Sequence, residues 1–270
     1  MKYILFLLCI ITSSIAAQNN DSLFVSANNF YKNAAFEKAI EDYKKIEEKG
    51  AVSPELYLNL GNTYYKLNQV GPAIYYYEKA LKLDPIQDDV LNNLVFAKRL
   101  ALDNIAMVPK TVFQRFHENY LQKLTYNEWA ILTVIFSFLT ALLFLFFYFA
   151  YTPSKKRIYF TTSVLSLILF IFVIFITYNE YDRSKNNKEA IVFAEKTTIR
   201  NAPTLNAEAI FTLHEGAKVI VLDAIDNWNF KFAGGNGNPI VDKYKDKHPI
   251  DFVRTVLSHP LVNVMDSHGH

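Results

Sequence analysis

The sequence predicts a multi-domain membrane protein with three parts: an all-α solenoid of helical repeats, a two-helix transmembrane hairpin and a small all-β domain. Three observations predict this fold class. A 34-residue pattern of apolar and small side chains occurs twice within residues 18–102. Residues 129–154 and 158–179 then contain no Asp, Glu, Lys or Arg. Short alternating segments separated by turn residues follow from residue 190.

Composition and charge restrict the class of protein further. The 270 residues are 51% hydrophobic and 20% charged, which excludes a disordered or collagen-like chain. Lys and Arg number 28 against 26 Asp and Glu, so the net charge is only +2. The basic cluster Lys155, Lys156 and Arg157 flanks an apolar run, which is typical of membrane proteins. We therefore expect a membrane as partner and no nucleic acid.

Residues 1–17 have the three-part layout of a secretory signal peptide. Lys2 precedes a short apolar run, and Ala16 and Ala17 offer a cleavage point. The run is shorter than the roughly 20 residues that span a bilayer. An uncleaved anchor and a lipid attachment at Cys9 are the alternatives. Because Cys9 is the only cysteine, a cleaved chain would have no disulfide, thiol chemistry or cysteine metal site.

Residues 18–102 contain a repeat of paired helices. Residues 53–85 place aromatic, leucine and small side chains at helical spacing before Pro85 ends the run. The same classes of side chain recur 34 positions earlier: Ala27 matches Gly61, Phe30 matches Tyr64, Ala39 matches Ala73, and Tyr43 matches Tyr77. This period, with small residues where helices cross, resembles the tetratricopeptide repeat. Residues 88–102 continue the helical spacing of apolar side chains, but no second helix follows them. This predicts a capping helix at the end of the array.

The resemblance implies a concave groove lined by the first helix of each unit. Our candidate peptide-binding residues on that face are Asn28, Lys32, Asn62, Tyr65, Lys66 and Arg99. Two asparagines and two lysines among them are 34 positions apart. Amide and ammonium groups stacked along a groove could hold a peptide backbone and a carboxylate, through charged hydrogen bonds of roughly 1.5–3 kcal/mol each when shielded. The alternative is a solvated polar face.

Residues 103–128 form an amphipathic bridge that we expect to lie on the membrane surface or to dock on the repeat domain. Residues 129–151 and 158–178 are predicted transmembrane helices, because each is uncharged and long enough to cross a bilayer. Neither has an ionisable side chain at mid-membrane, which disfavours transport. The basic turn 152–157 and the signal peptide predict that the turn is cytoplasmic and that both flanking domains are outside.

Residues 190–240 are predicted to form a small β domain. Candidate strands with turn residues between them are Lys196–Arg200, Ala209–Leu213, Lys218–Leu222 and Trp228–Phe232. The run from Ile199 to Trp228 resembles the bacterial SH3-like barrel, a domain that often binds peptides or cell-wall material. The Gly-Trp pair of that family is missing, and no obvious last strand precedes Val253–Leu257. The barrel is therefore either closed by a divergent segment or incomplete, and residues 241–270 are a divergent tail.

The sequence contains no recognisable catalytic constellation. It has no Gly-rich phosphate loop, no Gly-x-Ser-x-Gly elbow and no metal-ligand spacing. Four of the six histidines lie in the tail, but their separations fit no standard zinc pattern. We therefore predict a protein that is not an enzyme and that holds no cofactor or metal.

The order of the modules resembles the BatE-like proteins of the Bacteroides aerotolerance operon family. The resemblance covers most of residues 1–232, and the order of the modules is what makes it specific. It implies a scaffold in the inner (cytoplasmic) membrane, with the repeat domain and the β domain in the periplasm, that organises an aerotolerance or envelope-stress complex. The implied partners are membrane proteins of the same operon, including von Willebrand factor A-type domain proteins.

Two other classes of function stay open. A cell-wall-binding protein would use the β domain on peptidoglycan, which implies cell-wall contact. A membrane enzyme or transporter would need chemistry that these residues do not reveal, and the uncharged membrane helices count against it.

Overall fold

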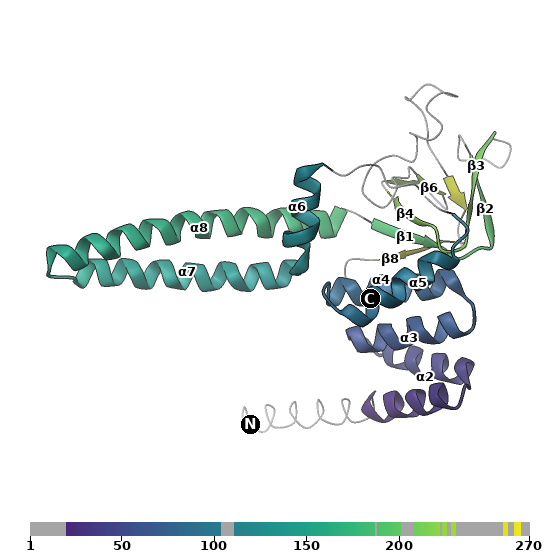
Figure 1. Ribbon diagram of the computed structural model, residues 1–270. Coiled ribbons are helices and arrows are strands. Elements are labelled where there is room, and N and C mark those ends of the chain that lie inside the picture. The colour runs from purple at the N-terminus through teal and green to yellow at the C-terminus, as the bar shows by residue number, and fades with distance from the viewer. Residues whose placement is uncertain are drawn as a thin grey trace, which may run out of the picture. The chain divides into compact units, whose positions relative to one another are not determined.

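The computed structural model describes residues 20–103, 111–186, 188–200, 208–221, 223–225, 228–230, 256–258 and 262–265. The chain divides into two compact units. The first contains the helices before Val108 and the strands from Lys188 onward, and the second is Pro109–Asn187 (Figure 1). The predicted signal peptide, residues 1–17, lies outside the described residues.

The first unit begins with an array of antiparallel helices. Residues 20–32 are helical, and the following helices are α2 (Phe36–Glu48), α3 (Pro54–Lys66), α4 (Val70–Leu83) and α5 (Asp88–Leu100). Ser53 begins α3 by accepting a hydrogen bond from the backbone N–H of Leu56 at 3.1 Å. The turn inside each helix pair contains a left-handed residue, Ala34 in the first and Asn68 in the second, 34 positions later. The backbone therefore repeats with the period of the sequence.

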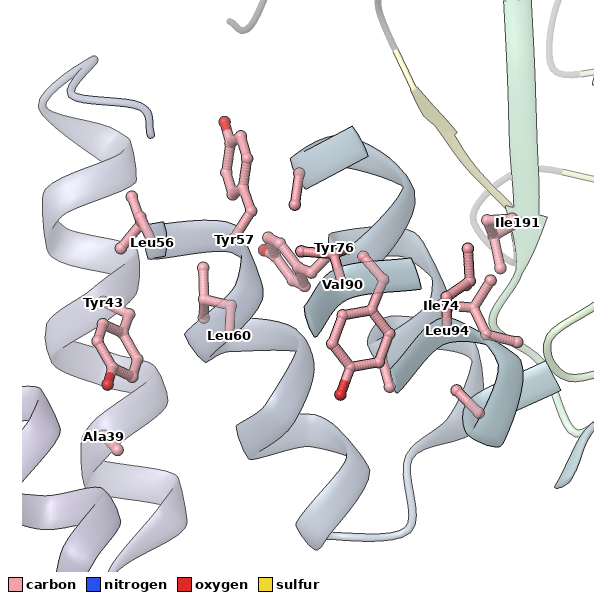
Figure 2. Close-up of a cluster of buried hydrophobic side chains, with 14 of the residues drawn as sticks. Ala39, Tyr43, Leu56, Tyr57, Leu60, Ile74, Tyr76, Val90, Leu94 and Ile191 are labelled. Carbon is pink, nitrogen blue, oxygen red and sulfur yellow. The ribbon is translucent and has the colours of Figure 1, made fainter. Parts of the chain in front are cut away.

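The core of the array consists of the side chains that the 34-residue period aligned. Ala27, Ala39 and Ala73 are fully buried, and Tyr43 and Tyr77 are at most 1% exposed. Small residues at these positions let the helices approach closely, and large side chains from the neighbouring helix fill the space. Figure 2 shows this layer, with Tyr43, Leu60, Tyr76 and Leu94 among the labelled side chains.

The strands of the first unit form two antiparallel sheets. The three-stranded sheet has the order β4-β1-β8, and the five-stranded sheet has the order β3-β2-β7-β6-β5. Their bounds are β1 Lys188–Val192, β2 Lys196–Arg200, β3 Ala209–His214, β4 Lys218–Val221, β5 Asp223–Ile225, β6 Trp228–Phe230, β7 Val256–Ser258 and β8 Val262–Met265. Over the residues that the structure describes, these strands do not close into a barrel.

The four predicted strands all occur, as β2, β3, β4 and β6, but the sequence pattern missed other strands. Two further strands lie in the predicted tail: β7, which overlaps the strand-like run Val253–Leu257, pairs with β2 and β6, and β8 pairs with β1. The tail therefore contributes one strand to each sheet. β1 and β8 pair with each other from distant parts of the chain, a relation that no local alternation of side chains indicates.

The helical array and the three-stranded sheet pack against each other within the first unit. Ile191 of β1 is fully buried in the same apolar cluster as Ile74 and Leu94, and Phe193 packs beside it (Figure 2). The backbone N–H of Gly71 donates to Glu215 Oε1 at 2.8 Å. A Cβ at Gly71 would lie 2.8 Å from the carbonyl oxygen of Val192, so the close approach requires glycine. The sheet thus covers the end of an array that has no second helix after α5.

The second unit is a helical hairpin preceded by a short helix. Its elements are α6 (Val112–Tyr120), the 3₁₀ turn η1 (Leu121–Lys123), α7 (Tyr126–Phe149) and α8 (Pro153–Asn186). By length and composition, α7 and α8 are both able to cross a membrane. Hydroxyl pairs join them along the seam, Thr133 with Thr177 at 2.9 Å and Thr140 with Ser166 at 2.8 Å.

The second apolar helix is longer than the predicted transmembrane helix, residues 158–178. Because α8 begins at Pro153, the basic residues Lys155, Lys156 and Arg157 lie in its first turns and not in a loop. Proline suits the first helical position, where its missing N–H has no partner in any case. The connection between the two helices is therefore only Ala150–Thr152.

Candidate functional site: a groove on the helical array

A pocket of about 260 Å³ opens on the helical array. Its lining combines polar and aromatic side chains from four helices, namely Tyr31, Asn62, Tyr65, Lys66, Tyr77, Asn93 and Phe96. Asn62, Tyr65 and Lys66 belong to the last two turns of α3, and Asn93 and Phe96 face them from α5. The residues from each helix line the same pocket because residues three and four positions apart lie on the same helix face.

An asparagine of α3 that lines the pocket is held in place by two hydrogen bonds. Asn62 Oδ1 accepts from the Tyr77 hydroxyl at 2.8 Å and from Asn93 Nδ2 at 2.8 Å. Both donors meet at one atom, which sets the orientation of the Asn62 amide. Its Nδ2 group has no hydrogen-bond partner among the described residues. The pocket therefore presents a fixed N–H₂ donor.

The same network occurs one repeat earlier. Asn28 Oδ1 accepts from the Tyr43 hydroxyl at 2.5 Å and from Asn59 Nδ2 at 3.1 Å. Each of these three residues lies 34 positions before its counterpart in the second network. Two asparagines are thus oriented by the same pair of donors in successive units, which makes a ladder of amides along one face.

The tyrosines of both networks are held in their protonated, donating form. Burial raises the pKa of Tyr43 to about 12, although the Asn59 amide nearby opposes the shift. Burial also raises the pKa of Tyr77. Each hydroxyl therefore keeps its proton, and donates to the asparagine beside it, up to a higher pH than an exposed tyrosine would.

One unit of the array matches a known family. The family model of the tetratricopeptide repeat matches residues 54–86, which include all of α3 and α4. The chain contains a tetratricopeptide repeat. No curated protein matches the chain as a relative. Tetratricopeptide repeats mediate protein–protein interactions and are typically not catalytic, so this part of the chain is an interaction module.

The structure brings together three of the six predicted groove residues. Asn62, Tyr65 and Lys66 line the pocket of the tetratricopeptide repeat. Asn28 and Lys32 lie one unit earlier and do not line it, although Asn28 belongs to the amide ladder described above.

The remaining candidate, Arg99, lies beside the pocket and does not line it. Its guanidinium carbon is 5.5 Å from the centre of the Phe96 ring, and Phe96 does line the pocket. A cation stacked on the exposed Phe96 ring is able to meet a ligand at the rim.

Sequence reasoning missed the residues that complete the tetratricopeptide pocket. Asn93 orients Asn62, and Tyr31 and Phe96 supply two of the aromatic walls. One signal was present: Asn59 and Asn93 are 34 positions apart, as Asn28 and Asn62 are. Tyr31 and Tyr65 show the same separation, whereas Phe96 has no aromatic counterpart 34 positions earlier.

The chemistry of the pocket suits binding. A fixed amide, the Lys66 ammonium and three aromatic side chains (Tyr31, Tyr65 and Phe96) can donate hydrogen bonds to a peptide backbone or carboxylate and pack against an apolar side chain. Over the described residues there is no group of three His, Cys, Asp or Glu side chains that could hold a metal ion.

Proposed function

We propose that this protein is a membrane-anchored scaffold whose tetratricopeptide groove binds an extended, acidic segment of a partner protein. The observation that carries the proposal is the pocket in which the Asn62 amide is oriented by Tyr77 and Asn93 beside the Lys66 ammonium. Donor groups held in position before binding lower the entropic cost of ordering a flexible peptide.

Anchoring in the membrane is supported by α7 and α8. Large apolar side chains are exposed along both helices, including Phe138 at 73% and Phe175 at 68%. Exposed apolar surface of this extent favours a lipid environment. The helical array and the three-stranded sheet belong to one compact unit and come before and after the hairpin. The two ends of the hairpin therefore belong on the same side of the membrane, as two crossings allow.

The cellular setting in this proposal is the inner membrane, with the repeat and the strands in the periplasm. The signal-like N-terminus and the bases Lys155, Lys156 and Arg157 near the hairpin turn support this orientation. We further propose membership of the BatE-like proteins, an SH3-like origin of the β strands, and partners with von Willebrand factor A-type domains in an aerotolerance complex. The order of the modules supports these assignments.

Affinity purification of the full-length protein from its own membranes in mild detergent tests the proposal. The variant is Lys66→Ala combined with Tyr65→Ala, because these side chains line the pocket without orienting Asn62. The control is Lys49→Ala, an exposed lysine at the end of α2. We expect membrane proteins to accompany the wild type and the control and to be lost from the groove variant, as measured by quantitative mass spectrometry.

Each other outcome has a definite meaning. Partners that stay with the groove variant would place the contact in the hairpin or on the β strands and would overturn the groove. The absence of partners from every sample would overturn the scaffold. Peptidoglycan binding through the β strands would then be the next function to test, with isolated cell-wall sacculi as the ligand.

A further inference from the structure

We infer that α6 is a membrane-interface helix whose aromatic face enters the lipid at headgroup depth. This inference rests on the proposed anchoring of α7 and α8. It adds a third membrane contact, which lies in the plane of the bilayer and does not cross it. The four residues that would make this contact are Val112, Phe113, Phe116 and Tyr120.

These four side chains form one uncovered apolar face. Val112 is 71% exposed, Phe113 86%, Phe116 52% and Tyr120 64%. At about 100° per residue they fall within an arc of roughly 100° on the helix, and Gln114, Arg115, Glu118 and Asn119 occupy the remainder. A nine-residue helix with such a division has the pattern of an interfacial segment.

The position of α6 within its unit fits that role. Figure 1 shows α6 lying across α7 and α8 at the open end of the hairpin, where α7 begins and α8 ends. A helix that crosses two membrane-spanning helices at their ends lies in the plane of the membrane surface. The aromatic face of α6 is therefore at the depth of the headgroups if the hairpin spans the bilayer.

Several contacts hold α6 in this position. His117 Nε2 lies 3.3 Å from Glu180 Oε1 near the end of α8, and the same nitrogen contacts the Arg183 guanidinium. The Trp129 indole N–H donates to the Leu121 carbonyl oxygen at 3.0 Å, which fixes the start of α7 to the turn after α6. These contacts limit rotation of α6 about its own axis. The His117 side chain is consequently mostly buried, with 16% of its surface exposed.

Lipid is the occupant that the observations favour. Large apolar side chains are also exposed in the first turns of α7, where Ile131 is 60% exposed and Val134 54%. Capping boxes at Thr111 and Thr125 begin the two helices separately, so that α6 can lie along the surface while α7 enters the bilayer. One continuous lipid phase would cover both apolar faces, whereas a protein partner would have to match the hairpin and α6 together.

Site-directed spin labelling of the full-length protein in lipid nanodiscs tests this inference. The background is Cys9→Ser, which removes the only cysteine in the sequence. Labels at Phe113→Cys and Phe116→Cys report the apolar face, and labels at Arg115→Cys and Asn119→Cys report the polar face. Phe138→Cys in α7 and Lys32→Cys on the repeat are the references for lipid and water. Power saturation with oxygen and with an aqueous nickel complex measures depth, and circular dichroism verifies helical content.

We expect labels at Phe113 and Phe116 to be several-fold less accessible to nickel than labels at Arg115 and Asn119. Their depth should lie between that of the Phe138 label in lipid and that of the Lys32 label in water. Equal nickel accessibility on both faces, with Phe138 deep in lipid, would overturn the inference and leave the anchoring intact. Equal protection of both faces from nickel and from oxygen would indicate a protein cover and would also overturn it. A Phe138 label accessible to nickel would overturn the anchoring itself.

Discussion

Glu78 and Lys218 are 140 positions apart in the chain, and their charged groups lie 2.9 Å apart. Lys98 approaches Glu78 from α5 at 2.8 Å, and Glu189 of β1 approaches Lys218 at 2.9 Å. Glu78 is only 8% exposed. Lys82 of α4 also lies 3.5 Å from Glu189, and this network of five charges joins the helical array to the three-stranded sheet at the place where Ile191 enters the apolar core.

The first prediction concerns the loss of one charge from this network. Glu78→Gln leaves Lys98 and Lys218 without their shared carboxylate, and removal of one partner from a buried pair costs up to about 3–5 kcal/mol. We expect a clear fall in the melting temperature of the full-length protein, measured by circular dichroism in detergent. Glu48→Gln, at an exposed position of α2, is the matched control. Equal melting temperatures for the two variants would show that the network does not stabilise the fold.

The second prediction concerns pH. Burial by itself would raise the pKa of Glu78, but Lys218 and Lys98 outweigh burial and lower this pKa to about 2. An unfolded glutamate titrates near pH 4.3. The charge of Glu78 therefore contributes its full stabilisation above about pH 4.5, and the contribution disappears as the pH falls toward 2. We expect the difference in melting temperature between wild type and Glu78→Gln to shrink across this range. A constant difference would contradict the lowered pKa.

The third prediction concerns the closest helix crossing. A Cβ at Gly61 would lie 2.5 Å from the Tyr77 ring, whose hydroxyl is bound to Asn62. The ring cannot withdraw without breaking that bond, so we expect Gly61→Ala to destabilise the repeat by about 1–3 kcal/mol. Chemical denaturation monitored by circular dichroism would measure the loss. The double variant Gly61→Ala with Tyr77→Leu should recover part of it, and Asn92→Ala on the exposed face of α5 should change stability little.

The fourth prediction concerns the seam of the hairpin. The Thr140 and Ser166 hydroxyls are 2.8 Å apart, and each lies on an apolar helix. Interhelical hydrogen bonds in membranes average about 0.6 kcal/mol, with a maximum near 1.7 kcal/mol. A double-mutant cycle with Thr140→Val and Ser166→Ala should give a coupling energy in that range when unfolding is titrated with detergent. Thr161→Val is the control, since its hydroxyl donates only to carbonyls of its own helix. A coupling energy of zero would mean that the Thr140–Ser166 hydrogen bond does not help to join the two helices.

Much of the helical part of this protein could be predicted because its signals are local. The 34-residue match of Tyr43 with Tyr77 and of Ala39 with Ala73 located the buried positions of two helix pairs, since a period of 3.6 residues leaves a readable stripe. The two apolar helices followed from the lack of charge over residues 129–154 and 158–179. These features depend only on neighbours within one or two turns.

Only half of the candidate site could be predicted, because local signals report helix faces and not the contacts between helices. Helical phase located Asn62, Tyr65 and Lys66 on one face, and these residues do line the pocket. The hydrogen bonds that orient Asn62 come from Tyr77 on α4 and Asn93 on α5, so the direction of the amide depends on how three helices pack. Sequence spacing gives the helix face on which a residue lies, but it does not give the donors that form hydrogen bonds with the oxygen of its side chain.

The repeat, its period, the apolar hairpin and four of the strands can be read from the amino-acid sequence, because each has its own periodicity or composition. The tertiary structure alone decided that Glu78 meets Lys218, that β1 covers the end of the helical array, and that β7 and β8 return from the tail to join the sheets. These contacts join residues that lie tens to more than a hundred positions apart. Their free energy comes from burial and charge pairing that exist only after the chain has folded, so no local pattern reports them.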